Sequence, residues 1–583
     1  MWAINRWLES KIGSMLKMQA ETTLARTLGI GSFATSIFIL WGVVSDPVNV
    51  TKHFLLGAVA VSAFILASSS GFRLIWRDSK VSVVTTSLFL VFALSAVINS
   101  ESPLAQNLYG SYGRNTGFMT YLFLALLFVA ALSLRAKKSF EFIIRALLAT
   151  GIVNVAYSLW AWQVGDFVGW SNPYNTILGT FGNPNFIGAF LGIFVSVLVA
   201  YLLASGTKLW VRIVGAVLAV ITFLEIEHSN AIQGIVVAAG GISIVLFFYI
   251  RSRFNSIVPA IVFSTFVLVS GVFAVFGALQ KGPLTDLIYK TSVSLRGEYW
   301  NAGINMGREF PLTGVGMDAY GDWYRVLRRD SALITPGPGT VTNTAHNVNL
   351  DLFAFGGWPL FLSYITIIVL ALISVIRVII RSKQYNWVFV SLAAGWICYQ
   401  VQALISINQI GLAIWGWLFS GAVIAYEIST RQSVAENLVS KSGIKRFKAG
   451  YEGVNFSPQL LASIGLVIGS LLAVPPLSAD MKWRNALQSG SVQVVEAALV
   501  PSYLNPENTN KYFQAIQLFE SNQLPDYAYK YAKIAVEFNP NAFDAWKLLY
   551  YISKSTQADK NLALQNMKRL DPKNPNVLDG PKS

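Results

Sequence analysis

Long apolar segments follow one another along most of the chain. A helix crosses the hydrocarbon core of a bilayer with about 20 apolar residues. The 583 residues are 54% hydrophobic and only 13% charged, which lies outside the range of soluble globular domains. We therefore predict an all-α, polytopic membrane bundle of about thirteen spans. They are centred in 29–45, 53–71, 81–98, 118–134, 140–164, 186–204, 209–224, 231–250, 256–280, 350–376, 388–407, 410–427 and 458–475.

Composition divides the chain into three parts. Residues 1–28 are basic but lack the compact apolar core and cleavage site of a signal peptide, so we interpret them as a cytoplasmic or interfacial segment. Residues 29–475 form the predicted membrane-embedded domain, which includes one large polar loop at 281–349. Residues 476–583 are polar and helical in pattern. In this last part, Leu-Asn-Pro, Phe-Asn-Pro and Leu-Asp-Pro motifs begin at 504, 538 and 570, a period that resembles tetratricopeptide repeats.

The net charge of +15 is explained by its distribution. When the N-terminus is placed in the cytoplasm and thirteen spans alternate, the cytoplasmic segments carry 22 Lys and Arg residues, whereas the short loops on the other side carry only Lys52 and Arg114. This asymmetry is the positive-inside pattern of membrane proteins, so no nucleic-acid partner is needed. It predicts that the large loop and the C-terminal part both lie outside the cytoplasmic membrane.

The large loop carries the residues best suited to chemistry. Polar loops of this length inside a compact protein are usually functional, and this one ends with His346, one of only three histidines, at the start of a span. A neutral histidine can accept a proton from an attacking hydroxyl, and planar guanidinium groups can bind a diphosphate. Solvated or lipid-bound arginines and a merely structural histidine are the competing interpretations. The arginines considered are Arg296, Arg308, Arg325, Arg328 and Arg329.

Three further loops fall on the same side of the predicted membrane as the large loop. They are residues 99–117, residues 165–185 and the short turn 225–230. Candidate binding residues here are Arg114 and Asn185, and Asn347 beside His346 adds a third. The topology therefore predicts that these polar segments converge on one face.

At this point the residues resemble the O-antigen ligase/polymerase superfamily. The resemblance covers about 80–430 and depends on the order, spacing and shared face of several short motifs. They are Arg296 and Trp300 followed by Pro311-Leu312-Thr313-Gly314-Val315-Gly316, then His346-Asn347 with Leu350 and Gly356-Gly357, and, earlier in the chain, Gly113-Arg114-Asn115-Thr116-Gly117 and Gly179-Thr180-Phe181-Gly182-Asn183-Pro184-Asn185.

The resemblance implies a metal-independent, inverting glycosyltransferase that uses no cofactor. Its donor would be a lipid-linked oligosaccharide on undecaprenyl diphosphate, and its acceptor a glycan, a lipid or a protein. His346 would activate the acceptor hydroxyl and Arg296 would neutralise the leaving diphosphate, while Arg114, Arg308, Arg325, Arg328, Asn185 and Asn347 would bind substrate. Cys398 is the only cysteine, so one chain can form neither a disulfide nor a cysteine metal site.

One departure from the family pattern and several alternatives stay open. Ligases of this family often carry Ser-Arg-Gly after the short acidic turn, whereas this chain reads Ser229-Asn230-Ala231 there. Arg114 or an arginine of the large loop would have to replace that charge. The alternatives are a polysaccharide polymerase, a protein O-oligosaccharyltransferase, a solute transporter, or a scaffold that binds a protein partner through residues 476–583.

Overall fold

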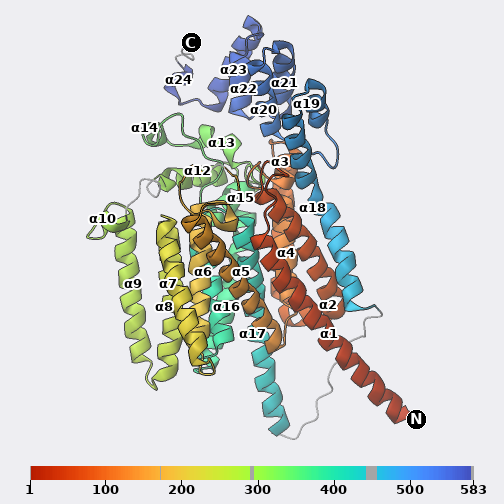
Figure 1. Cartoon of the computed structure of the whole chain (residues 1–583), viewed down its shortest axis with the longest axis vertical. Helices are drawn as coiled ribbons and strands as arrows, with labels where there is room; N and C mark the ends of the chain where they lie inside the picture. The colour runs from red at the N-terminus through yellow and green to blue at the C-terminus, as the bar shows by residue number, and fades with distance from the viewer. Residues whose placement is uncertain (1, 171, 289–294, 442–455, 579–583) are drawn as a thin grey trace.

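The computed structural model describes residues 2–170, 172–288, 295–441 and 456–578, and its regular elements are helices (Figure 1). The prediction of an all-α polytopic membrane protein is confirmed. The helices are α1 (Trp2–Ile37), α2 (Asn49–Ile98), α3 (Leu104–Tyr109), α4 (Phe118–Ala131), α5 (Lys137–Gln163), η1 (Gly179–Phe181), α6 (Pro184–Leu202), α7 (Leu209–His228), α8 (Ile232–Arg253), α9 (Val258–Ala278), α10 (Thr285–Ile288), α12 (Arg296–Glu309), α13 (Tyr320–Leu327), α14 (Ser331–Ile334), α15 (Val348–Arg381), α16 (Trp387–Ala403), α17 (Ile410–Lys441), α18 (Pro458–Ser489), α19 (Val492–Leu499), α20 (Thr509–Ser521), α21 (Pro525–Phe538), α22 (Phe543–Tyr551), α23 (Gln557–Leu570) and α24 (Pro575–Leu578).

Ten of the helical segments in the described residues are long and apolar enough to cross a membrane. Each predicted span coincides at least partly with a helix, but the spans in α1, α4 and α16 are not among the ten. α4 has only 14 residues and α16 has 17, which is shorter than the roughly 20 that a perpendicular crossing requires. Both are almost wholly buried inside the bundle, so neighbouring helices and not lipid surround them.

The first predicted span, 29–45, is helical only in its first part. α1 ends at Ile37, and residues 38–48 form irregular turns before α2 begins. Asp46 stabilises this break, because its Oδ1 accepts hydrogen bonds from the backbone N–H groups of Val48 and Asn49. Such a side-chain bond to the backbone competes with helix continuation.

Lys52 also lies elsewhere than predicted. It was expected in a short outside loop, but it lies in the first turn of α2 and is fully buried. Its Nζ donates hydrogen bonds to the carbonyl oxygens of Thr35 and Ser36, at 3.0 and 2.6 Å. These carbonyls belong to the last turn of α1, which has no intrahelical donors for them. The lysine thus caps α1.

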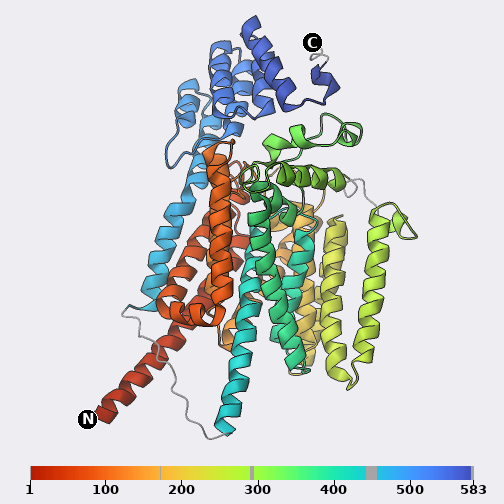
Figure 2. The same ribbon diagram turned by 180° about the vertical axis from the view of Figure 1, so that it is seen from behind.

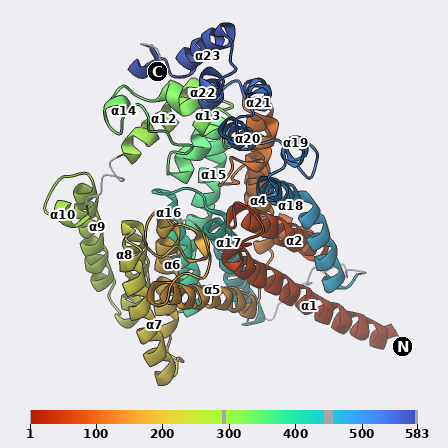
Figure 3. The ribbon, with the colours of Figure 1, turned by 45° about the horizontal axis from the view of Figure 1, so that its top comes forward.

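The large loop forms a cap over one end of the bundle. Figures 1 and 2 both show α12, α13 and α14 at the end where the C-terminal helices lie, while the start of α1 and the end of α17 lie at the opposite end. Viewed with the top forward, α12 and α13 lie beside the upper end of α15 (Figure 3). The predicted loop 281–349 includes residues 289–294, which lie outside the described residues.

The C-terminal part consists of paired helices with their own apolar core. α20 packs against α21, and α22 packs against α23. α18 continues through Pro475-Pro476 as far as Ser489, where Gly490 ends it in the left-handed conformation typical of a helix C-terminus. The predicted boundary at 475/476 therefore falls inside a helix that joins the bundle to the C-terminal helices. The tetratricopeptide assignment stays a prediction.

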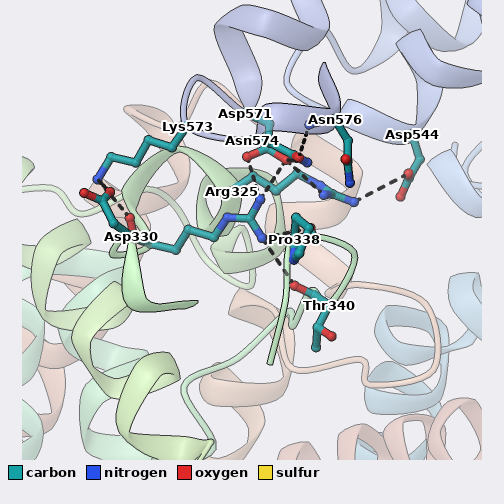
Figure 4. Close-up of polar contacts among 10 residues, drawn as sticks. Arg325, Asp330, Pro338, Thr340, Asp544, Asp571, Lys573, Asn574 and Asn576 are labelled. Atoms are coloured by element: carbon teal, nitrogen blue, oxygen red, sulfur yellow. Dashed lines mark hydrogen bonds and ion pairs between the residues drawn. The ribbon is translucent and has the colours of Figure 1, made fainter. Parts of the chain in front are cut away.

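A buried ion pair joins the large loop to the last long helix pair. Arg328, which follows α13, places its Nη2 at 2.6 and 2.8 Å from the two carboxylate oxygens of Asp571, and both side chains are fully buried. Arg325 adds a second contact to the same carboxylate at 3.2 Å (Figure 4). Asn574 Nδ2 also donates to Asp571. This cluster fixes the C-terminal helices against the cap.

We predict that Asp571→Ala frees the C-terminal helices from the cap. Removal of one partner leaves the Arg328 charge buried and unpaired, which typically costs about 3–5 kcal/mol. Thermal unfolding in detergent should therefore occur at a lower temperature, and limited proteolysis should cleave between α18 and α23 faster. The matched control is Asp330→Ala, which removes an exposed partner of Lys573 and should change little. Unchanged melting and cleavage of Asp571→Ala would show that this pair does not hold the two parts together.

Candidate active site

One cavity at the capped end of the bundle brings together four of the predicted site residues. It has a volume of about 830 Å³ and is lined by Arg114, Asn185, Arg296 and His346. We call it the arginine cavity. Its walls come from the turn before α2, the loops 110–117 and 165–185, the start of α12, and the segment that precedes α15. The loops 99–117 and 165–185 therefore meet the large loop at this cavity, whereas the turn 225–230 contributes no residue to its lining.

The backbone at His346 is held in a strained conformation. Its φ is +53°, in the left-handed region that non-glycine residues seldom adopt. Thr344 Oγ1 accepts a hydrogen bond from the His346 N–H, and the carboxylate of Asp351 accepts from Thr344 Oγ1 and from the Ala345 N–H, each at 2.7 Å. Because Asp351 lies in the first turn of α15, the helix itself determines where the imidazole lies. Backbone strain of this kind occurs most often at functional sites.

Asp318 positions the loop that carries Arg114. Its Oδ2 accepts hydrogen bonds from the Ser111 N–H at 2.8 Å and from Thr116 Oγ1 at 3.1 Å. Asp318 lies just before α13 but does not cap it, because the helix begins at Tyr320 after Ala319 and the Asp318 carboxylate bonds to a loop some 200 residues earlier. Burial raises the pKa of the Asp318 carboxyl to about 6, against the opposing effect of these hydrogen bonds and of Arg114.

Arg296 reaches the cavity from the first turn of α12. Burial lowers the pKa of its guanidinium below the ordinary value. One helical turn later, the ring of Tyr299 lies 5.7 Å from the imidazole of His346, centroid to centroid, with an angle of 31° between the planes. The hydroxyl of Tyr320 donates to the backbone carbonyl of Tyr299, which fixes this part of α12 against α13. The start of α12 thus brings both a cation and an aromatic wall to the histidine.

The electrostatics of the cavity keep His346 uncharged. Burial is the main cause that lowers the pKa of its imidazole to about 3, and the charges of Arg114 and Arg296 lower it further. Burial also lowers the pKa of Arg114, whose Nη1 is shielded from solvent and has no hydrogen-bond partner among the described residues. Burying a charge without a partner is unfavourable. The cavity therefore combines a neutral proton acceptor with two cations that favour an anionic ligand.

The other predicted binding residues lie outside this cavity's lining. Asn347 caps α15, because its Oδ1 accepts from the N–H groups of Asn349 and Leu350. Arg308 lies exposed near the end of α12. Arg325 and Arg328 are bound to Asp571 at the junction with the C-terminal helices.

Sequence reasoning missed several residues of the lining. Tyr299 is one of them. Asp46 and Asn49 fall between the predicted spans 29–45 and 53–71, and the turn they occupy forms one wall. Asn343 was missed as well. A polar Asp-Pro-x-Asn sequence between two apolar runs was the one available signal for the turn at 46–49.

Comparison with known families supports the resemblance. Residues 226–365 match the family model described as O-Antigen ligase. The matched segment extends from the end of α7 into α15, so it includes Arg296 and His346, whereas Arg114 and Asn185 precede it. The match supports glycan transfer by a multi-pass membrane protein of the O-antigen ligase type. No curated protein matches the chain.

We predict that His346 stays uncharged between about pH 5 and pH 8, because its pKa of about 3 lies below this range. The ¹³Cε1 signal of His346 in histidine-labelled protein should not shift across that range, with the assignment made from its loss in His346→Gln. Arg114→Gln removes a nearby cation and should raise the pKa, whereas Arg308→Gln, which alters an exposed arginine, should not. A midpoint near the ordinary value of about 6.5 in the unsubstituted protein would contradict this description of the cavity.

Proposed function

We propose that the protein transfers a glycan from an undecaprenyl-diphosphate carrier to an acceptor hydroxyl in the arginine cavity. The observation that carries the proposal is the arrangement of one neutral imidazole beside two half-buried guanidinium groups. A glycosyl diphosphate needs positive charge around its leaving group, and its acceptor needs a proton acceptor. The match to the O-Antigen ligase model over 226–365 supports the same chemistry.

The transfer is a single displacement at the anomeric carbon. The acceptor oxygen forms a bond to this carbon while the bond from the carbon to the diphosphate oxygen breaks, and the anomeric configuration inverts. The acceptor proton goes to the imidazole of His346. The electron pair of the broken bond stays on undecaprenyl diphosphate, whose charge Arg114 and Arg296 stabilise.

Donor binding would prepare the base. In the empty cavity two cations depress the pKa of His346, so its imidazole is a weak proton acceptor. A diphosphate bound between Arg114 and Arg296 offsets both charges, and a nearby anion raises the pKa of a histidine. The acceptor hydroxyl would then be activated mainly in the presence of donor. Arg114 takes the place of the arginine that the Ser229-Asn230-Ala231 stretch lacks.

We expect His346→Ala and Arg296→Ala to reduce transfer of a labelled glycan from undecaprenyl diphosphate in proteoliposomes. A positioned acid–base group contributes about 100-fold to 10,000-fold to rate. His346→Ala should lose transfer while it retains donor binding, whereas Arg296→Ala and Arg114→Gln should also weaken donor binding. The matched control is Arg308→Gln, an arginine on α12 outside the cavity lining. Wild-type transfer rates in both His346→Ala and Arg296→Ala would eliminate the proposal.

Other members of the same superfamily share this chemistry but differ in acceptor, so a polysaccharide polymerase and a protein O-oligosaccharyltransferase remain variants of the proposal. The scaffold hypothesis gives a role to the C-terminal helices but none to the arginine cavity. A transporter is less well supported, because transport sites typically place ionisable groups near the membrane midplane. Arg145, the cation that the sequence placed within a span, lies two-thirds exposed and near Glu141 one helical turn away. The polar cavity instead lies at the capped end.

We also propose that this capped end lies outside the cytoplasmic membrane. The positive-inside distribution supports this orientation, and the C-terminal helices share the end with the cap, whereas the basic turn between α15 and α16 lies at the opposite end (Figure 1). A lipid-linked glycan would then meet its acceptor on the outer face.

This orientation is testable with single cysteines, because the native Cys398 is buried. Arg329→Cys places an exposed thiol in the large loop, and Gln384→Cys places one in the turn after α15. A membrane-impermeant maleimide should label Arg329→Cys in intact spheroplasts and Gln384→Cys only after permeabilisation. The reverse pattern would place the cavity in the cytosol and exclude the proposed reaction.

A further inference from the structure

A second cavity lies between the cap and the C-terminal helices. It has a volume of about 400 Å³, within the range of roughly 300–1,000 Å³ typical of small-molecule sites. We call it the interdomain cleft. One wall comes from α3 and the cap, and the other from α18 and from α20 to α22. Tyr112 and Asn343 line both this cleft and the arginine cavity, so the two are adjacent.

The lining of the interdomain cleft combines amide groups with aromatic rings. Gln106 on the cap side and Asn510 on the C-terminal side both line the cleft. Gln106 Nε2 already donates to Asp318 O and Asp322 Oδ2, each at 3.2 Å. The side-chain amide of Asn510 offers two donors and an acceptor, which suits the neighbouring hydroxyls of a sugar. Half-buried aromatic rings, including Tyr109 and Phe513, add flat apolar surfaces for the C–H faces of sugar rings. An alkyl chain would form no hydrogen bond with the Asn510 amide.

The charges of the interdomain cleft differ from those of the arginine cavity. Four carboxylates line the cleft, at Asp322, Asp480, Glu507 and Asp544. Its two cations are both engaged with protein groups: Arg325 with Asp571 at 3.2 Å, and Lys511 Nζ with Asn505 Oδ1 at 2.8 Å. A diphosphate therefore favours the arginine cavity, and an uncharged, hydroxyl-rich ligand suits the cleft.

The two cavities meet near the catalytic histidine. Asn343 lies three residues before His346, and the Thr344 and Ala345 contacts to Asp351 fix the segment between them. Tyr112 lies two residues before Arg114 in the loop that Asp318 holds. Tyr112 and Asn343 thus mark the place where a chain bound in the interdomain cleft comes nearest to the arginine cavity.

We propose that the interdomain cleft binds the saccharide portion of the acceptor and delivers one of its hydroxyls to His346. This inference rests on the proposed transfer reaction and specifies its acceptor as a neutral glycan. The C-terminal helices then form half of the acceptor site. Their attachment through Asp571 sets the width of the cleft.

The kinetic test uses Asn510→Trp, which fills the cleft from α20. Transfer is measured in proteoliposomes with undecaprenyl-diphosphate glycan as donor and envelope glycolipid extracted from the source organism as acceptor. The half-saturating acceptor concentration should rise at least about tenfold, equivalent to 1.4 kcal/mol, while that of the donor stays unchanged. Gln517→Trp, which lies exposed on the same helix outside the cleft lining, should leave both constants unchanged. Acceptor saturation of Asn510→Trp equal to that of the wild type would overturn the inference.

A protection experiment gives a second measurement without a bulky substitution. The introduced thiol of Asn510→Cys should react more slowly with a maleimide in the presence of the oligosaccharide fraction released from the same envelope by mild acid. The thiol of Gln517→Cys should react at the same rate with and without it. Protection by a tryptic peptide fraction of envelope proteins, and not by oligosaccharide, would overturn the saccharide assignment. Equal reaction of Asn510→Cys in every case would overturn the site.

The two proposals fail in different ways. If His346→Ala and Arg296→Ala lose transfer but Asn510→Trp shows normal acceptor saturation, the interdomain cleft is not the acceptor site and the proposed transfer reaction still stands. Full transfer in both His346→Ala and Arg296→Ala would refute the proposed reaction in the arginine cavity, whatever binds in the interdomain cleft.

Discussion

The half-buried positive charge of Arg114 and Arg296 beside a neutral histidine is the constraint on which the rest of the site depends. Burial disfavours a guanidinium, and here two of them lie close enough to His346 to lower its pKa. The structure maintains this arrangement through rigid contacts: Asp318 holds the Arg114 loop, and α15 holds His346 through Asp351. Such preorganised charge is most useful where a negative charge develops during reaction. A diphosphate leaving group has that property.

The C-terminal helices are bound to the cap and line the interdomain cleft. Their connection to the cap includes a buried ion pair, Arg328 with Asp571, and the loss of either partner would leave the other charge buried and unpaired. The interdomain cleft and the arginine cavity lie side by side, with Tyr112 and Asn343 in the lining of both. The two proposals assign a neutral glycan to the first and a diphosphate to the second.

Much of the fold was accessible from the sequence because bilayer thickness imposes a repeating length on apolar segments. Alternation of these segments also predicted that the loops around Arg114, Asn185, Arg296 and His346 share one end, and the four residues do line one cavity. The exact ends of the helices between the long apolar segments were harder to predict from the sequence. Lys52 was placed in a loop, yet it caps α1, because a single lysine between two apolar runs gives no sign of the carbonyl groups it will meet.

The candidate site was predicted only in part, since side-chain partners depend on tertiary contacts. Arg325 and Arg328 have the composition of a phosphate site, but their partner Asp571 lies more than 240 residues later. Asn347 follows His346 and caps α15. The position of Asn347 in the motif does not show whether it caps a helix or binds a ligand. The resemblance to a family pointed to His346, Arg296 and Arg114 separately. The fold shows that all three line one cavity.

The most direct measurement is a cryo-EM structure of the protein in lipid nanodiscs with a non-transferable undecaprenyl-diphosphate glycan. The account predicts that the diphosphate lies between the guanidinium groups of Arg114 and Arg296, with the anomeric carbon facing the imidazole of His346. A diphosphate bound elsewhere, with the arginine cavity empty, would contradict it.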